Sequence, residues 1–301
     1  MISSLDPSAL SFLRGLNQIQ QRSQQAQREL TTGLRVNTVS DAPDQIAILW
    51  QTRADINEVQ QIQSNLGRVK PEVDTAETAV SSSVSLLERA QTLGAEGATG
   101  TATADTRQSL ASELGALLQQ LVANSNTSVE GRYIFSGDAD QQAPYSIDLT
   151  QANPISPYQG AAGTRQIQHP DGSLFTVSKT AQEIFDNPDP SKSVFGSINN
   201  LRIALLKNDQ TAIQSAMADV GTAGTYLNTQ LSFYGTVQDQ MAGAIDYGQN
   251  NLTQLKTQLS GIQDADEAQS ITELQLSATQ QQAALVSRSQ LPKTSLFDYL
   301  G

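Results

Sequence analysis

The N-terminal sequence from Asp6 to Leu34 reads DPSALSFLRGLNQIQQRSQQAQRELTTGL. Apolar or small residues recur along it every three or four positions, at Phe12, Leu16, Ile19, Ser23, Ala26 and Leu30. That spacing places them on one narrow face of a helix. Asp6 and Pro7 suit a helix start, and Gly33 suits a helix end. The stretch therefore predicts a long amphipathic helix with a thin apolar stripe.

The C-terminal part of the chain carries a matching pattern. Its stripe runs through Met241, Ile245, Gly248, Leu252, Leu255, Leu259 and Ile262, and strand-like sequence is confined to the middle of the chain. The predicted fold is mainly α, an elongated antiparallel helical bundle or coiled coil formed by the N- and C-terminal segments. A small, mainly β domain is expected between them. This layout favours an assembly subunit over an enzyme built around a pocket.

The composition supports a thin core and narrows the classes of function. Of the 301 residues, 38% are hydrophobic and 5% aromatic, as suits helices with narrow stripes. The net charge is −12 without a Lys/Arg cluster, so neither nucleic acid nor a membrane surface is an expected partner. The absence of Cys excludes disulfides and thiolate sites. Without a membrane-spanning run or a Sec-type signal, the chain is expected to be cytoplasmic or exported by another route.

Helix signals divide the chain into five expected parts. They are an N-terminal assembly helix (1–43), the N-terminal part of a helical rod (44–134), a β-rich insertion (135–180), the C-terminal part of the rod (181–263) and a C-terminal assembly helix (264–301). A single helix with few strong apolar residues is marginal in water. The terminal parts are therefore expected to be partly disordered in the free monomer.

Several local features are predicted in the first half of the chain. Asp41–Pro43 is expected to cap a long helix that extends to about Leu93, and Pro71 should kink or split this helix. The segment 94–103, rich in Gly, Ala and Thr, is predicted to be a turn. A helix with Leu on one face is expected over 105–129.

The second half begins with strand-like sequence and returns to helix. Residues 133–135 resemble a strand, and residues 165–177 a β-hairpin whose turn is Asp171-Gly172. Helices are expected again from about Ser191. A helix break is expected at 264–266, where acidic residues suit a new N-cap.

The residues that could carry chemistry are isolated. His169, the single histidine, is expected to be a surface residue of the hairpin turn, without a second metal ligand. The carboxylates of 264–267 lack the spacing of a calcium loop, and the glycines of 94–100 lack the Lys-Ser/Thr of a phosphate loop. Trp50 is expected to pack in the core. No catalytic residue, cofactor or metal site is predicted.

Two interpretations of the terminal stripes remain open on composition alone. The two ends can bury each other within one chain. Alternatively, the stripes can face neighbouring subunits, because a two-stranded coil always leaves one side available to another chain.

Two stretches resemble the bacterial flagellin family. Leu30–Pro43 resembles its N-terminal signature, a Ser/Thr-Gly, a basic residue near an Asn, and an Asp-rich cap before the second helix. Ala42 stands where a second Asp is common, which implies a weaker cap. Ile262–Leu285 resembles the other end of the family, with 264–266 at the helix break.

Within the family, three motifs are similar to those of the subunits at the hook–filament junction. They are GRYIFSG at 131–137 followed by Pro144-Tyr145, VFGSINNL at 194–201, and the ending SLFDYL at 295–300. The resemblance implies a structural subunit of the bacterial flagellum that forms the junction between hook and filament. A filament flagellin is the alternative, and a secreted enzyme with its site in the insertion is less favoured.

The resemblance also implies partners and a location. The partners would be copies of the chain in a ring, a second hook-associated junction protein, flagellin and a cytoplasmic export chaperone. The subunit would be extracellular, exported through the flagellar type III channel without a cleaved signal peptide. The residues expected to pack against other subunits are Phe12, Leu16, Ile19, Leu30, Leu34, Ile271, Leu274, Leu285, Leu296, Phe297 and Leu300.

Overall fold

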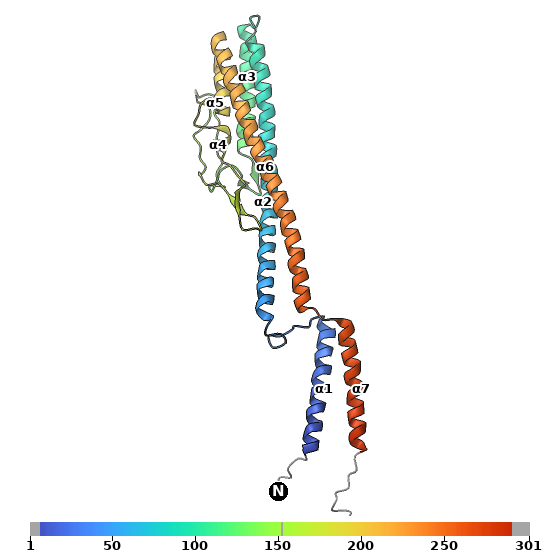
Figure 1. Ribbon diagram of the computed structural model, residues 1–301. Helices are drawn as coiled ribbons and strands as arrows, with labels where there is room; N and C mark the ends of the chain where they lie inside the picture. The colour runs from blue at the N-terminus through green and yellow to red at the C-terminus, as the bar shows by residue number, and fades with distance from the viewer. Residues whose placement is uncertain (1–6, 152, 291–301) are drawn as a thin grey trace, which may run out of the picture. The chain divides into compact units, whose positions relative to one another are not determined.

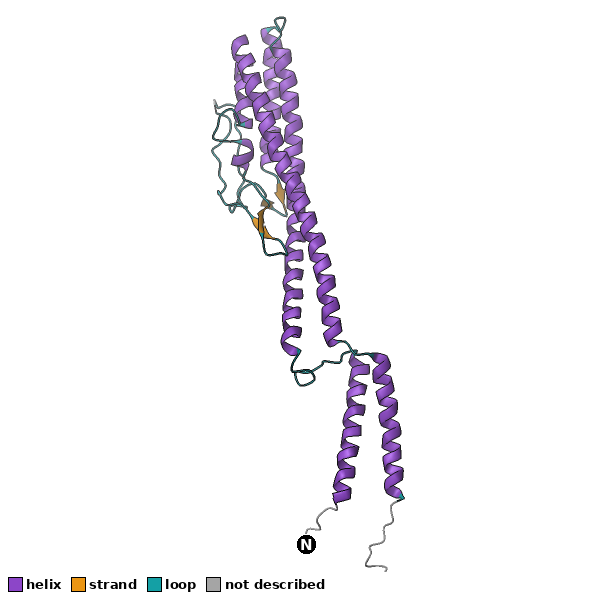
Figure 2. Ribbon diagram, in the orientation of Figure 1, coloured by secondary structure: helices purple, strands orange, loops and turns teal. Residues whose placement is uncertain are grey.

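The computed structural model describes residues 7–151 and 153–290, which form two compact units. The first contains the described residues up to Glu58 and from Asn251 onwards, and the second is Val59–Asn250. Helices dominate the described chain, and its named strands all lie in the second unit (Figure 1, Figure 2). The predicted mainly α fold with a small β-containing insertion is therefore confirmed.

The first unit has two helices of its own, α1 (Pro7–Thr32) and α7 (Glu267–Ser289). It also includes the beginning of α2 (Ile46–Gly97) and the end of α6 (Gln210–Gln263). The predicted end of α1 is confirmed, since Gly33 has φ +69°, a conformation that glycine adopts readily. The predicted start of α7 is confirmed too, because the Asp266 carboxylate accepts the N–H of Gln269 at 3.0 Å.

In the second unit, the core lies between α2, α3 (Ala104–Ser125), α5 (Val194–Leu206) and α6. The buried side chains follow the predicted helical spacing, with Leu66, Val73, Val80 and Leu87 on α2, Leu110, Leu114, Leu117 and Leu121 on α3, and Val194, Ile198, Leu201 and Leu205 on α5. A short helix, α4 (Ala181–Phe185), was not predicted. A capping box between Thr180 and Glu183 stabilises its first turn.

Of the two effects predicted for Pro71, a kink or a split, the split is wrong, since α2 is a single helix through Pro71. A proline inside a helix removes one backbone hydrogen bond, at a cost of ~3 kcal/mol. Pro71 itself lies on the exposed side of α2, whereas Leu66 and Val73 on either side of it are buried in the core. Packing of these neighbours holds the helix together across the proline.

The predicted turn over 94–103 begins later than expected, because α2 continues to Gly97. The two glycines of this last part serve close packing. A Cβ added to Gly97 would lie 2.3 Å from Cδ2 of Leu205, and one added to Gly94 would lie 3.0 Å from Cδ2 of Leu201. α2 and α5 can therefore approach each other closely at this end of the core.

The prediction that Asp41 caps the second helix is also wrong. Its carboxylate instead accepts the N–H groups of Asn37 and Thr38, at 2.9 and 2.7 Å, and so closes the loop that precedes α2. Ala42 is buried together with Val36 and Leu49. Ala42, which stands where the flagellin-like signature commonly has a second Asp, is thus part of a small apolar cluster.

The insertion contains the predicted hairpin. β3 (Gln166–Gln168) and β4 (Leu174–Thr176) pair antiparallel with Ile167 opposite Phe175, and Gly172 in the turn has φ +93°. The strand predicted over 133–135 begins one residue earlier, as β2 (Arg132–Tyr133), which pairs with β1 (Ser128–Val129). The rest of 135–180 consists mostly of loops and turns (Figure 2).

The expectation that Trp50 packs in the core is wrong, since 60% of its surface is exposed. Trp50 follows Leu49 directly on α2, and Leu49 is the residue that faces the apolar cluster with Val36. Neighbouring residues on a helix point about 100° apart, so the buried Leu49 turns Trp50 towards solvent.

Candidate assembly surface

α1 and α7 lie side by side and run antiparallel (Figure 1). Three side-chain contacts give the register along the pair. Oγ of Ser270 donates to the Glu29 carboxylate at 2.7 Å, Arg22 pairs with Glu273 at 3.5 Å, and the Arg288 guanidinium lies 5.7 Å from the ring centroid of Phe12. Residue numbers fall along α1 as they rise along α7, as expected of antiparallel helices.

The fully buried positions of the seam between these two helices are small residues, Ala26 on α1 and Ser270 and Ser277 on α7. Phe12, Ile19 and Leu30 lie half-buried on the same face of α1 as Ala26. Full burial of a Leu or Ile side chain contributes ~1.5–3 kcal/mol, whereas Ala and Ser bury far less apolar surface. The seam allows the two helices to approach closely, but its apolar contribution to stability is modest.

Some of the larger apolar side chains of the pair lie beside the seam, whereas the exposed Leu10, Leu276 and Val286 lie on other sides of the two helices. Leu13 is 45% exposed on α1, and Ile271 and Leu285 are 46% and 52% exposed on α7. Successive residues of a helix are rotated by about 100°. Around α7, counted from Ser270, this places Ile271, Leu274 and Leu285 at about 40–100°. Around α1, counted in the same sense from Ala26, it places Leu16 and Leu13 at about 80–140°.

These two sets lie on the same side of the helix pair. In antiparallel right-handed helices, turning in the same sense from the seam leads to the same side of the pair. We call this surface the open face, formed by Leu13, Leu16, Ile271, Leu274 and Leu285. A partly exposed row of Leu and Ile on a helix pair is typical of a surface that another chain covers.

The predicted packing residues fall into three groups. Ile271 and Leu285 are exposed on the open face. Several are half-buried, namely Phe12, Leu16, Ile19, Leu30, Leu34 and Leu274. Leu296, Phe297 and Leu300 lie outside the described residues. Sequence reasoning missed Leu13, although its spacing of three from Leu16 was a usable signal.

A backbone connection, which we call the clip, joins the segment after α1 to the segment before α7. Leu34 and Asp264 form an isolated antiparallel bridge. The N–H of Arg35 donates to the Gln263 carbonyl at 2.7 Å, and its guanidinium donates to the Ile262 carbonyl at 2.7 Å. The backbone N–H of Thr38, with that of Asn37, lowers the pKa of Asp41, whose carboxylate closes the adjoining loop.

In the second unit, the two internal motifs meet in an aromatic cluster. Phe195 of the 194–201 motif lies edge-on to Tyr145, with ring centroids 5.2 Å apart. It stacks on Phe185 at 5.6 Å, and Phe185 in turn contacts Phe135 of the 131–137 motif at 6.0 Å. Burial raises the pKa of Tyr145, so its hydroxyl stays protonated at neutral pH. These motifs build the core that holds the insertion against α5.

The ionisable residues of the insertion do not converge on a catalytic arrangement. The Thr150 hydroxyl donates a hydrogen bond to the Asp148 carboxylate at 2.6 Å, and this bond lowers the pKa of Asp148. Arg165 pairs with Glu72 on α2.

The prediction of a surface His169 is wrong in part, because its ring lies 5.3 Å from that of Tyr247 on α6. The hairpin turn folds back onto this helix and half-buries the imidazole.

The family assignment comes from both ends of the chain. Residues 4–140 match the bacterial flagellin N-terminal helical region, and residues 217–300 match the bacterial flagellin C-terminal helical region. The chain belongs to the bacterial flagellin family. Flagellin-family proteins are structural proteins of the flagellum. The helices that form the open face both lie within the matched regions.

Relatives match over nearly the full length. Flagellar hook-associated protein 3 of Escherichia coli strain K12 is 26% identical over 316 residues, covering 95% of both chains. Flagellin of Bacillus subtilis strain 168 is 25% identical, covering 96% of both. The crystal structure of flagellar hook-associated protein-3 from Legionella pneumophila covers 72% of this chain and 99% of that one, with a TM-score of 0.62 and 16% identity. This last likeness shows a shared fold.

Two searches of the described residues were negative. None of the helices there combines the length and hydropathy that a membrane span requires. In the same part of the chain, no three side chains of the His, Asp and Glu types come together in a way that could hold a metal ion.

Proposed function

We propose that this protein forms the junction between the hook and the filament of the bacterial flagellum. The observation that carries the proposal is the open face on the α1–α7 pair, inside the two regions that define the flagellin family. On this face Leu13, Ile271 and Leu285 remain about half exposed and are available for other subunits to cover. End-to-end similarity to hook-associated protein 3 favours the junction within this family.

In this role the subunit acts by packing and not by catalysis. Copies of the chain form a ring, in which the open face and the residues predicted for subunit packing contact neighbouring copies. The second hook-associated junction protein and the first flagellin subunits lie on the two sides of the ring. A cytoplasmic chaperone binds the chain before export, and the working location is extracellular.

Deletion of the gene in the source bacterium tests the junction role. Cells should keep their hooks, lose their filaments and release flagellin into the medium. The reason is that exported flagellin subunits then have no junction on which to assemble. Expression of the full chain from a plasmid should restore filaments. Normal filaments on the deletion strain would contradict the proposal.

A filament flagellin is the second candidate, supported by the similar match to the Bacillus subtilis flagellin. The two roles differ in polymerisation. Purified full-length protein seeded with sheared filament fragments should elongate them if it is a flagellin. A junction protein should leave their length unchanged, and antibody against it should label only the filament base.

A further inference from the structure

An open cavity of about 350 Å³ in the second unit carries an excess of positive charge. Three arginines line it, Arg68 from α2, Arg132 from β2 and Arg165 from the residue before β3. Glu72 is the one carboxylate among its lining residues, so three positive charges and one negative charge give a local sum of +2. The whole chain, in contrast, has a net charge of −12.

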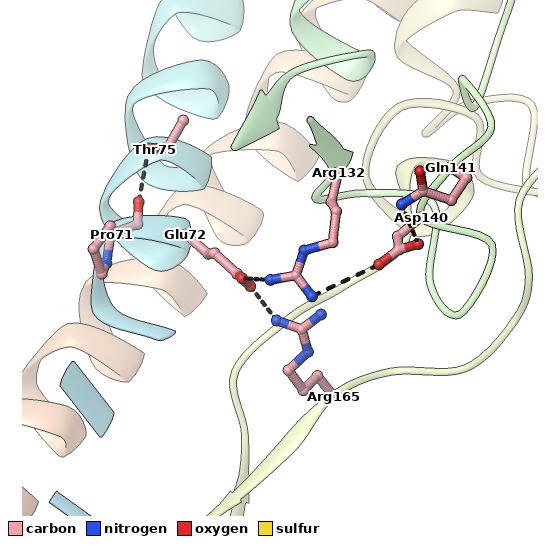
Figure 3. Close-up of polar contacts among 7 residues, drawn as sticks. All are labelled: Pro71, Glu72, Thr75, Arg132, Asp140, Gln141 and Arg165. Carbon is pink, nitrogen blue, oxygen red and sulfur yellow. Dashed lines mark hydrogen bonds and ion pairs between the residues drawn. The ribbon is translucent and has the colours of Figure 1, made fainter. Parts of the chain in front are cut away.

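Glu72 is shared between two of these arginines (Figure 3). Its Oε1 accepts from Nη2 of Arg132 at 2.9 Å, and its Oε2 pairs with Nη1 of Arg165. A guanidinium has five N–H donors, and one carboxylate cannot satisfy two such groups. Asp140 lies 3.8 Å from Arg132 and neutralises part of the excess. Both guanidinium groups therefore keep donors for a further acceptor.

Arg68 adds a third cation without a counterion. Its side chain is exposed, and within the described residues it forms no ion pair. The amide side chains of Asn65, Gln166 and Gln168 complete the polar part of the lining. The cavity therefore presents cationic donors and amides, a combination that suits a carboxylate.

We propose that this cavity binds the carboxylate of an acidic side chain on an adjacent copy of the chain. Asp and Glu number 30 against 18 Lys and Arg, so a neighbouring copy presents mostly carboxylates at its surface. The guanidinium fork binds a carboxylate with two parallel hydrogen bonds, which gives direction as well as attraction. The inference rests on the proposed function only in requiring that copies lie side by side.

Malonate tests whether the cavity binds carboxylate. The melting temperature of the full-length protein should rise with sodium malonate above its value in sodium chloride at equal ionic strength, because a ligand of the native state stabilises it. Arg68→Gln should weaken the apparent malonate affinity roughly fivefold. Lys207→Gln, which removes an exposed charge outside the cavity, should match the wild type. An equal malonate effect in both variants would overturn the proposal.

Cross-linking tests whether the carboxylate comes from a second copy. The chain has no Cys, so Arg68→Cys offers a single attachment point for a photoreactive maleimide, with Lys207→Cys as the control. In isolated flagella, Arg68→Cys should give dimers of this chain. Cross-links only to another protein, or none, would overturn the proposal. Antibody labelling of the same sample tests the junction role separately, because labelling along the filament would contradict that role and leave the cavity result valid.

Discussion

The N–H group of Ala265 donates a 2.9 Å hydrogen bond to the carbonyl oxygen of Gly33. This bond is part of the clip, and it joins the end of α1 to the residue pair that precedes α7. Both residues sit at helix breaks that are visible separately in the sequence. In the folded chain the two breaks are one structural feature, which sets where α1 and α7 begin to pair.

The first prediction concerns the left-handed backbone of Gly33. Gly33→Ala should destabilise the first unit by about 1 kcal/mol, because a Cβ disfavours positive φ. Hydrogen exchange at Ala265 should accelerate accordingly. Gly15→Ala is the matched control, since Gly15 lies within α1 with open space around it. This substitution should stabilise the first unit by ~0.5–1 kcal/mol. Equal exchange rates in both variants would show that the clip does not depend on Gly33.

The second prediction concerns the pH dependence of the loop that Asp41 closes. The Thr38 and Asn37 N–H groups hold the pKa of Asp41 below its unfolded value of about 3.9. The ionised carboxylate therefore stabilises the loop above that value, and this contribution is lost as the pH falls through the lower folded pKa. Exchange at the Asn37 and Thr38 amides, corrected for intrinsic rates, should increase as the pH falls in that window.

Asp41→Asn should remove this pH dependence, because the amide keeps an acceptor oxygen but does not ionise. Asp44→Asn is the control, since the Asp44 side chain is an exposed carboxylate near the same loop. A persistent acid transition in Asp41→Asn would assign the effect to another group.

The third prediction tests the open face. Leu285→Asn should reduce incorporation of the chain into flagella tenfold or more, because a Leu side chain covered by a neighbour contributes ~1.5–3 kcal/mol. The free monomer should change by less than ~0.5 kcal/mol, since Leu285 is half exposed there. Immunoblots of sheared flagella and thermal melting give the two readouts. Leu174→Asn, at an exposed position on β4, should leave incorporation unchanged.

The fourth prediction concerns the close approach of α2 and α5. Gly97→Ala should destabilise the second unit by ~1–3 kcal/mol, because the new Cβ would overlap the buried side chain of Leu205. Urea unfolding of the full chain, followed by the exchange of core amides on α5, measures the loss. Gly67→Ala on the same helix meets open space and should be neutral or stabilising. A neutral Gly97→Ala would mean that the core can shift to admit a methyl group.

Local features of the fold could be predicted because their causes are local. The end of α1 at Gly33, the start of α7 at Asp266 and the hairpin turn at Gly172 each depend on a few adjacent residues. The split predicted at Pro71 fails because its neighbours on α2 are buried in a core built from distant parts of the chain. The cap predicted at Asp41 fails for a local reason, since its carboxylate accepts the N–H groups of Asn37 and Thr38 in the preceding loop.

The amino-acid sequence by itself determined that both ends are amphipathic helices and which of their residues are apolar. Periodicity is a property of one helix, so it shows that a stripe exists without showing what covers it. Only the tertiary structure decided that Ala26, Ser270 and Ser277 form the seam and that Ile271 and Leu285 stay exposed. The physical reason is that a seam depends on the register between two helices far apart in the chain, and that register is set by the clip between Leu34 and Asp264.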